Sequence, residues 1–210
     1  MKHKKPPNFE HITKKLTRIM NGIEFDSDCG SIFDDVQRYM DEVKIKPIAQ
    51  GSSRMTYRLN KDYVLKVAIN YIGVAQNKTE AHYFNNIKNP LFNKNISCSK
   101  KGYWIIAEYA GPVTSKKIEE LFGCTKGQLD SMITYALTKR ARNKTILDLY
   151  KTKFHNHKFF KALRKLPKLG LIADDYSSFY SENYGISKKG LVLLDGGLTN
   201  ETAQLYYWQF

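Results

Sequence analysis

The sequence has few cysteines, and their positions suit neither disulfide pairing nor metal binding. Cys29, Cys98 and Cys124 lie far apart, are odd in number and form no Cys-x-x-Cys pair. A zinc ribbon and a disulfide framework are therefore not indicated, and we expect reduced, partly buried thiols. Long apolar runs are also missing. No stretch reaches the roughly 18 residues that a membrane span needs, so we expect no membrane partner.

Acidic residues are scarce compared with basic ones. The chain has 34 Lys and Arg against 20 Asp and Glu, which gives a formal net charge of +14 over 210 residues. Such a charge attracts nucleic acid, ATP or an acidic protein surface, but does not distinguish among them. The basic N-terminus is not followed by an apolar segment, so it is not a secretory signal and a cytoplasmic protein is expected.

Hydrophobic periodicity predicts an α+β protein in two lobes. Two helices are predicted first, followed by a mostly β segment with one helix, a linker at 110–112, a helical segment and a final strand pair. We therefore expect an N-terminal helical extension over 1–44, a β-rich N-lobe over 45–110 and a helical C-lobe over 111–210. The expected helices cover 9–23, 31–43, 79–87, 115–122, 126–139, 145–153 and 158–166. The expected strands cover 45–50, 55–59, 62–69, 96–99, 103–108, 184–187 and 191–194.

The final strand carries a candidate metal ligand. Four apolar residues, 191–194, are followed at once by Asp195, Gly196 and Gly197. A carboxylate at the mouth of a strand can hold Mg²⁺ against a nucleotide phosphate. Taken alone, the heptapeptide is more typical of a plain strand that runs into an Asp-Gly turn. Features upstream decide between these interpretations.

Three of these features lie in the β-rich segment. The Gly51-Ser52-Ser53 turn can present backbone N–H groups and hydroxyls to phosphate oxygens, although a plain hairpin turn fits it equally well. Lys66 lies inside an apolar strand, where a lysine is costly without a partner. Glu80 follows fourteen residues later on a helix and could neutralise Lys66. The alternatives are an outward-facing lysine and a surface glutamate.

The fourth feature is a polar segment before the final strand pair. Asp174 and Asp175 precede Asn183, which stands directly before the first of the two strands. Asp175 could orient or deprotonate a hydroxyl, and Asn183 could share a metal with Asp195. Acids in a loop are more often simply solvated, so their order relative to Lys66 and Glu80 is what favours a site.

This ordered series resembles the protein-kinase fold, and more closely the small kinase-like proteins encoded by bacteriophages, over about residues 45–200. The resemblance implies a two-lobed kinase-like fold with a short helical C-lobe, in the host cytoplasm if the chain is phage-encoded. It is carried by Gly51-Ser52-Ser53-Arg54, Val64-Leu65-Lys66-Val67-Ala68, Glu80, Ile105-Ile106-Ala107-Glu108-Tyr109-Ala110, Asp175, Asn183 and Asp195-Gly196-Gly197.

The resemblance also implies roles in binding ATP. Lys66 would hold the α- and β-phosphates and pair with Glu80. The segment Glu108, Tyr109 and Ala110 would be the hinge that meets the adenine through backbone groups. The turn at Gly51, Ser52 and Ser53 would cover the phosphates.

Catalytic and metal-binding roles follow in the same way. Asp175 would be the base, and Asn183 and Asp195 would bind Mg²⁺. The chain departs from the family pattern at this point, because it lacks the His-Arg of the His-Arg-Asp signature and has Ser178 five residues before Asn183. The turn has one glycine instead of three, Gly196 stands where the family has phenylalanine, and thirteen residues follow Gly197.

Three functions remain open. The first is an ATP- and Mg²⁺-dependent phosphotransferase that acts on a protein or small acceptor. The second is a catalytically degraded pseudokinase, a scaffold for a host or viral protein. The third is a basic nucleic-acid-binding protein, which the stretches 139–142 and 161–168 suggest. We interpret His155 and His157 as surface histidines and not as a nuclease motif.

Overall fold

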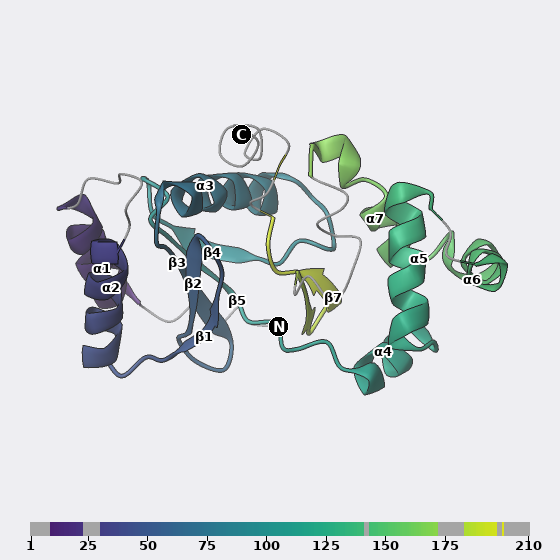
Figure 1. Cartoon of the computed structure of the whole chain (residues 1–210), viewed down its shortest axis with the longest axis horizontal. Coiled ribbons are helices and arrows are strands. Elements are labelled where there is room, and N and C mark those ends of the chain that lie inside the picture. Colours follow the sequence, from purple (N-terminus) through teal and green to yellow (C-terminus); the bar gives the residue numbers. More distant parts are fainter. Residues whose placement is uncertain (1–8, 23–29, 141–142, 172–182, 197–198, 200–210) are drawn as a thin grey trace, which may run out of the picture. The chain divides into compact units, whose positions relative to one another are not determined.

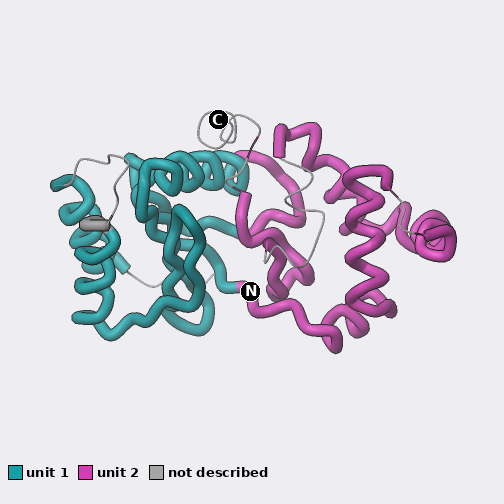
Figure 2. Tube along the Cα trace, in the orientation of Figure 1, with its two compact units in different colours: residues 1–85, 94–109 teal, residues 86–93, 110–210 magenta. Residues whose placement is uncertain are grey.

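The computed structural model describes residues 9–22, 30–140, 143–171, 183–196 and 199. The chain divides into two compact units (Figure 2). Unit 1 is formed by residues 1–85 and 94–109, and unit 2 by residues 86–93 and 110–210. The architecture mixes helices with antiparallel strands, as the sequence predicts. Within the described ranges, no helix combines the length and hydrophobicity needed to cross a membrane.

A five-stranded antiparallel sheet lies at the centre of unit 1, in the spatial order β1-β2-β3-β5-β4 (Figure 1). The middle strand, β3, pairs with β2 on one side and β5 on the other, and Lys66 lies opposite Thr56 and Ile105. The strands are β1 (Pro47–Gln50), β2 (Arg54–Arg58), β3 (Tyr63–Ala68), β4 (Asn95–Cys98) and β5 (Trp104–Glu108).

One face of this sheet packs against two N-terminal helices, α1 (Glu10–Asn21) and α2 (Gly30–Glu42). Side chains alternate between the two faces of a strand, so every second residue of β2 and β3 enters this core. Helices α1 and α2, which the sequence sets apart within a helical extension over 1–44, thus share a core with the sheet. The buried cluster includes Ile12, Leu16, Met20, Val36, Met40, Met55, Tyr57, Leu65, Val67 and Ile106.

The other helix of unit 1, α3 (Tyr71–Asn86), begins eight residues before the predicted start at 79. Its buried positions include Gly73, Gln76, Asn77 and Glu80, spaced as one helical face. Because this buried face is polar, the helix has no apolar stripe and the sequence pattern did not reveal its first two turns.

Unit 2 is mainly helical, and capping side chains mark several helix starts. Thr114, Thr125, Asn143 and His157 each accept a hydrogen bond from a backbone N–H of the helix that follows, which satisfies a donor in the first turn. The helices are α4 (Ser115–Phe122), α5 (Lys126–Thr138), α6 (Lys144–Leu149) and α7 (Lys158–Leu163), with a 3₁₀ turn, η2 (Pro167–Leu169).

The helix predicted over 145–153 is not uniform. α6 ends at Leu149 and continues as a π-helical turn, η1 (Tyr150–Phe154). The N–H of His155 donates to the carbonyl of Tyr150, five residues back, at 2.7 Å. Such wide turns are rare and recur at functional sites.

A two-stranded hairpin, β6 (Tyr184–Ser187) and β7 (Gly190–Leu193), completes the described part of unit 2. Its positions agree with the predicted strand pair to within one residue. Gly111 bridges to Ile186 on the hairpin, and Phe92 bridges to Leu193. The segment before β4 and the segment after β5 therefore both bridge to the hairpin, and all three belong to unit 2.

Candidate active site

Lys66 and Glu80 form a buried ion pair in unit 1. The Nζ of Lys66 lies 2.7 Å from Oε1 of Glu80, and Glu80 is fully buried with 0% of its surface exposed. Lys66 lies on the face of β3 opposite Leu65 and Val67, which places it under α3. The structure thus brings together two residues that the sequence places fourteen positions apart, and the buried lysine has the acidic partner it requires.

Arg54 is a third member of this group, and sequence reasoning missed it. Its Nη1 lies 2.8 Å from Oε2 of Glu80 and donates to Oδ1 of Asn77 at 3.2 Å. Glu80 therefore places one carboxylate oxygen against Lys66 and the other against Arg54. The alternation of β2 carried a signal: Arg54 and Thr56 share the face of the sheet that bears Lys66, opposite Met55 and Tyr57.

The turn between β1 and β2 is tied closely to α3. Ser53 is buried, and its hydroxyl donates to Oε1 of Gln76 at 2.7 Å. The N–H of Gly51 donates to the carbonyl of Arg54 at 2.9 Å. In the turn predicted to cover phosphates, the Ser53 hydroxyl and the Gly51 N–H already donate hydrogen bonds within the protein. Gly51 and Ser52 nevertheless have exposed surfaces.

Gly73 makes this close packing possible. A Cβ at position 73 would lie 2.0 Å from the carbonyl oxygen of Ser53 and 3.1 Å from Cα of Ala68. Asn70 supports the same contact, since its side chain accepts from the N–H of Gly73 and donates to the carbonyl of Ser52. The first turn of α3 therefore rests directly on the turn at residues 51–53.

The predicted hinge segment has two of its N–H groups engaged within unit 1. Glu108 donates to the carbonyl of Lys94 at 2.9 Å, and Tyr109 donates to the carbonyl of Asp62 at 2.7 Å. The guanidinium of Arg58 stacks on the Tyr109 ring, 3.2 Å from the ring centroid. Backbone contacts to an adenine from this segment would therefore use its carbonyls or the N–H of Ala110.

Asn183 and Asp195 lie at the same end of the hairpin in unit 2. The N–H of Leu194 donates to the carbonyl of Asn183 at 2.7 Å, which continues the strand pairing by one position. Asp195 is therefore one residue from the position opposite Asn183. Both residues are partly exposed. Carboxylate and amide oxygens are ligands that suit Mg²⁺, which usually takes one or two protein ligands together with phosphates.

Packing inside unit 2 fixes this hairpin. A Cβ at Gly185 would lie 2.7 Å from Leu194 and 2.9 Å from the Cβ of Ala110, so only glycine fits there without movement. Tyr184 is buried, and burial raises the pKa of its phenol, with a further contribution from the nearby charge of Asp130 on α5. Asp130 is itself buried, and sequence reasoning missed its contribution.

Some sequence predictions fall outside the described residues. Asp174, Asp175 and Ser178 all lie in the segment 172–182, so the assignment of a catalytic base stays a prediction. Cys29 also lies outside, whereas Cys98 is an exposed free thiol and Cys124 a buried one. Among described residues, no group of three or more His, Cys, Asp or Glu side chains is arranged to hold a metal ion.

Of the two histidines interpreted as surface residues, His157 is only partly exposed and has a structural role. Its Nδ1 accepts from the N–H of Phe159 and caps α7. Its ring is partly buried among the rings of Phe122, Phe154 and Phe160. His155 is exposed, as expected. A histidine directly before a helix was the available signal, because the N-cap position favours a side chain that accepts a hydrogen bond.

Comparison with known proteins gives little beyond a general likeness. No family model and no curated protein matches this chain. A search of solved structures matches it to APH(2″)-IIa, in a ternary complex with streptomycin and ATP. The identity is 13% and the TM-score 0.37, over 83% of this chain and 71% of that chain. At this level of similarity, a functional assignment rests on the residues of this chain.

Proposed function

We propose that this protein is a kinase-like phosphotransferase that uses ATP and Mg²⁺ to phosphorylate a protein or a small acceptor. The observation that carries the proposal is the buried Lys66–Glu80 pair between a central strand and the helix above it. In kinase-like enzymes an ion pair of this kind holds a lysine toward the nucleotide phosphates.

The remaining assignments follow from the same proposal. Asn183 and Asp195 are the proposed metal ligands, and Asp175 is the proposed base. Gly51, Ser52 and the segment 108–110 are the proposed contacts to the nucleotide, through backbone groups. When bound, Mg²⁺ would neutralise charge on the phosphates as it develops during transfer.

Arg54 makes it possible to separate a catalytic role of Lys66 from a structural one. In Lys66→Met, Glu80 keeps Arg54 as a cationic partner, so the fold should persist while phosphate transfer is lost. In Arg54→Met, the Lys66–Glu80 pair remains, so transfer should persist at a reduced level. Equal activity in the two variants would contradict a direct role of Lys66 in binding phosphate.

The central experiment measures transfer of labelled phosphate from ATP to the protein itself and to a lysate, with Mg²⁺ present. We expect Asp195→Asn to lower the rate by at least about a hundredfold, because metal-assisted stabilisation of transition-state charge supplies several kcal/mol. Asp34→Asn is the matched control, since Asp34 is exposed on α2. If wild type and Asp195→Asn behave alike, the proposal fails.

The pseudokinase scaffold remains a second candidate because of the Arg54–Glu80 contact. Since Glu80 binds two buried cations, the group could be retained for its structural role alone. A thermal-shift assay with ATP and Mg²⁺ distinguishes the candidates when combined with the transfer assay. Stabilisation without transfer favours the scaffold. If neither stabilisation nor transfer is observed, both an enzyme and a nucleotide-responsive scaffold are contradicted.

A further inference from the structure

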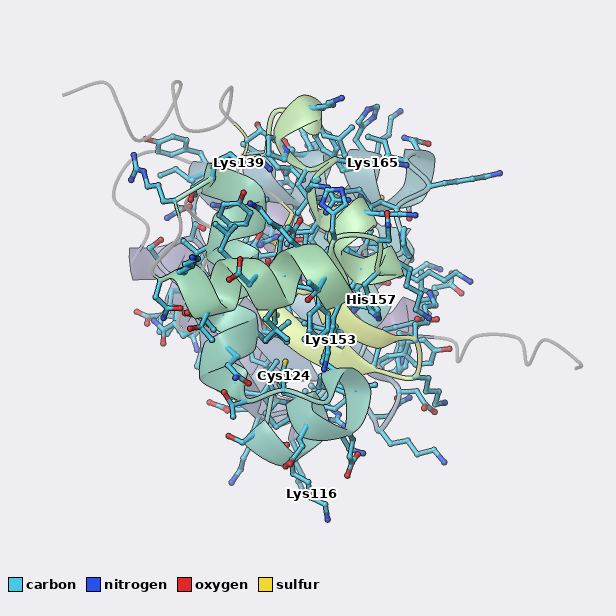
Figure 3. All side chains as sticks on the ribbon, turned by 90° about the vertical axis from the view of Figure 1, so that its right-hand side faces the viewer. Lys116, Cys124, Lys139, Lys153, His157 and Lys165 are labelled. Atoms are coloured by element: carbon cyan, nitrogen blue, oxygen red, sulfur yellow. The ribbon has the colours of Figure 1, made fainter. Side chains whose placement is uncertain are left out.

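The positive charge of the chain is concentrated in the helical part of unit 2. Residues 126–171 contain twelve lysines and arginines but only two acids, Asp130 and Asp148. Asp130 is buried, so it contributes little negative charge to the surface. Figure 3 shows Lys139, Lys153 and Lys165 spread over this face of the unit. The surface of these helices therefore attracts anions.

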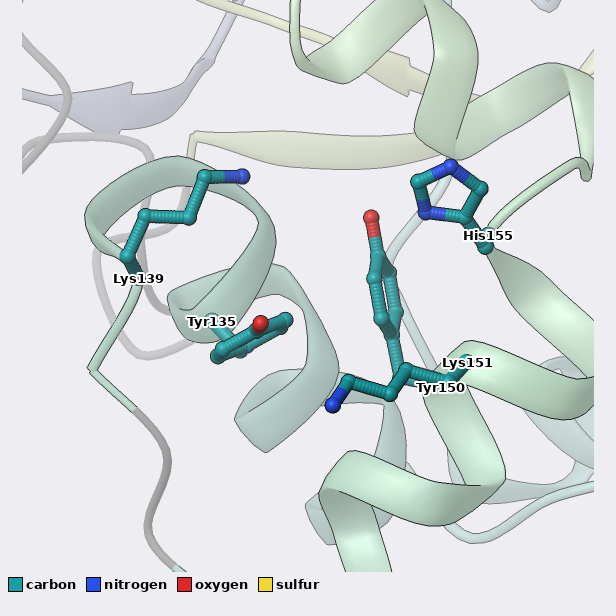
Figure 4. Close-up of a pocket in the computed structure, with 5 residues that line it drawn as sticks. All are labelled: Tyr135, Lys139, Tyr150, Lys151 and His155. Carbon is teal, nitrogen blue, oxygen red and sulfur yellow. The ribbon is translucent and has the colours of Figure 1, made fainter.

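A cavity opens within this basic surface. Its volume is about 380 Å³, and its lining consists of two tyrosines, two lysines and a histidine (Figure 4). None of the lining residues is acidic. The volume is near the small end of the range for ligand pockets, about 300–1,000 Å³. The lining residues are Tyr135, Lys139, Tyr150, Lys151 and His155.

The π-helical turn builds one wall of this cavity. A wider turn rotates each successive residue by a smaller angle, so side chains four and five positions apart come toward one side. Tyr150, Lys151 and His155 therefore line the same cavity. Arg164 fixes this wall, since it donates to the hydroxyl of Tyr150 and to the carbonyl of His155.

Lys139 forms the other wall in a strained backbone conformation. It ends α5 with φ of 63°, a left-handed conformation that normally favours glycine or asparagine. Its Nζ lies 3.3 Å from the carbonyl of Ala136 and 5.7 Å from the centroid of the Tyr135 ring. This conformation ends the helix and holds the Lys139 side chain beside the Tyr135 ring.

The two tyrosine rings differ in what they can offer a ligand. They meet nearly edge to face, with centroids 5.2 Å apart and an interplanar angle of 72°. Tyr150 is 2% exposed and presents little beyond its edge, whereas Tyr135 is partly exposed. A flat ligand can therefore stack on Tyr135 while its anionic group meets the lysines.

We propose that this pocket binds one nucleotide of a single-stranded nucleic acid, with the base on Tyr135 and phosphates at Lys139 and Lys151. Aromatic side chains set in a basic groove are the usual platform for unpaired bases. Lysines beyond the pocket can neutralise neighbouring phosphates. A duplex keeps its bases stacked, and an acidic peptide has no base to stack on Tyr135. The site lies within unit 2 and does not depend on the proposed phosphotransfer.

The test measures binding of a fluorescently labelled twelve-nucleotide oligothymidylate to the full-length protein by fluorescence anisotropy. If about three basic groups meet phosphates, a fourfold rise in salt should weaken binding roughly twentyfold. The double variant Lys139→Glu/Lys151→Glu should bind at least about tenfold more weakly. Lys46→Glu/Lys116→Glu is the matched control, because both lysines are exposed outside the pocket and the charge change is equal.

Two substitutions separate base stacking and backbone strain from net charge. Tyr135→Ala should weaken binding by roughly fivefold or more, whereas Tyr135→Phe keeps the ring and should bind as wild type does. Lys139→Gly should weaken binding while it raises the melting temperature, since glycine relieves the left-handed conformation. A purely structural lysine would not produce these opposite effects.

Four results would overturn the proposal. These are an equal loss of affinity in the control double variant, no effect of Tyr135→Ala, equal competition by a twelve-residue polyglutamate, and tighter binding of a duplex. The first would reduce the effect to net charge, the third would indicate an acidic protein partner, and the second and fourth would exclude an unpaired base.

Discussion

At the scale of single residues, Glu80 is the side chain on which unit 1 most depends. It lies between two buried cations, and it offsets the desolvation cost of both. A buried ion group is weak evidence of net stabilisation. Removing its shared member, however, leaves uncompensated buried charge.

We therefore expect Glu80→Gln to lower the free energy of unfolding by about 3–5 kcal/mol, because Lys66 and Arg54 lose their common counter-charge. Urea denaturation at neutral pH measures this. Glu120→Gln, which breaks the exposed Lys117–Glu120 pair, is the control and should cost less than about 1 kcal/mol. Similar losses of stability in the two variants would contradict the role of Glu80 as the shared counter-charge of Lys66 and Arg54.

His157 predicts a pH dependence of stability. Burial, followed by the charge of Lys158, lowers the pKa of its imidazole below the ordinary 6.5. The unfolded chain therefore binds more protons than the folded one as the pH falls below 6.5. Stability from this group is complete above that pH and declines as the pH drops through the folded pKa. Protonation at Nδ1 would also remove the cap on α7.

The measurement is a series of thermal melts from pH 8 to pH 5, with His157→Asn beside the wild type. Asparagine can cap the helix but does not titrate, so the variant should lose less stability than wild type across this range. Parallel pH profiles for the two proteins would assign the dependence to other groups.

At the scale of elements, the contact between α3 and the turn at residues 51–53 fixes the candidate nucleotide site. Polar contacts hold the helix to the turn, and the absence of a Cβ at Gly73 lets the two lie close together. Because the contact is made through the backbone of Ser53, a small change in the helix would displace the turn. This would also disturb the residues around Glu80.

Gly73→Ala should destabilise the protein by about 1–3 kcal/mol, because the added methyl meets a backbone carbonyl that cannot move freely. Gly127→Ala is the matched control on α5, where nothing lies within 4 Å of an added Cβ. That change should stabilise the helix by up to about 1 kcal/mol. Chemical denaturation of both variants tests the pair, and equal effects would contradict the tight packing at Gly73.

For the whole molecule, the chain divides into two compact units, and the N-terminal helices belong to the core of the first. α1 and α2 cover the sheet face that carries Met55, Tyr57 and Leu65. Deleting residues 1–44 would therefore expose a continuous apolar surface. We expect the shortened chain to aggregate and to bind a hydrophobic dye. A soluble product with unchanged melting behaviour would contradict a shared core.

A point substitution tests the shared core without removing a segment of the chain. Leu16 is fully buried in α1, whereas Leu121 in α4 is 42% exposed. Leu16→Ala should lower the free energy of unfolding by about 2–5 kcal/mol, because it removes buried methyl groups and leaves a cavity. Leu121→Ala should change it by less than about 0.5 kcal/mol. Denaturant titrations of the two variants supply the comparison.

Most of the elements could be predicted from the sequence, because periodicity and helix caps depend on residues that are close together in the chain. The sequence placed the strands of the sheet and the hairpin within one or two residues. It offered a Lys66–Glu80 pair as one interpretation, beside an outward-facing lysine and a surface glutamate, and the structure shows the pair. It missed the start of α3, because a buried polar face carries no hydrophobic period. It also missed the π-helical turn, which differs from an α-helix by one hydrogen-bond register.

Which side chains share a buried environment depends on how the elements pack and could not be predicted from the sequence. Arg54 joins Glu80, and Asp130 acts on Tyr184, because packing brings together elements that are distant in sequence. The pocket around Tyr135 likewise needs a strained lysine at one helix end and a wide turn from another. Spacing along the chain encodes neighbours along one element, whereas contacts between elements depend on how those elements pack.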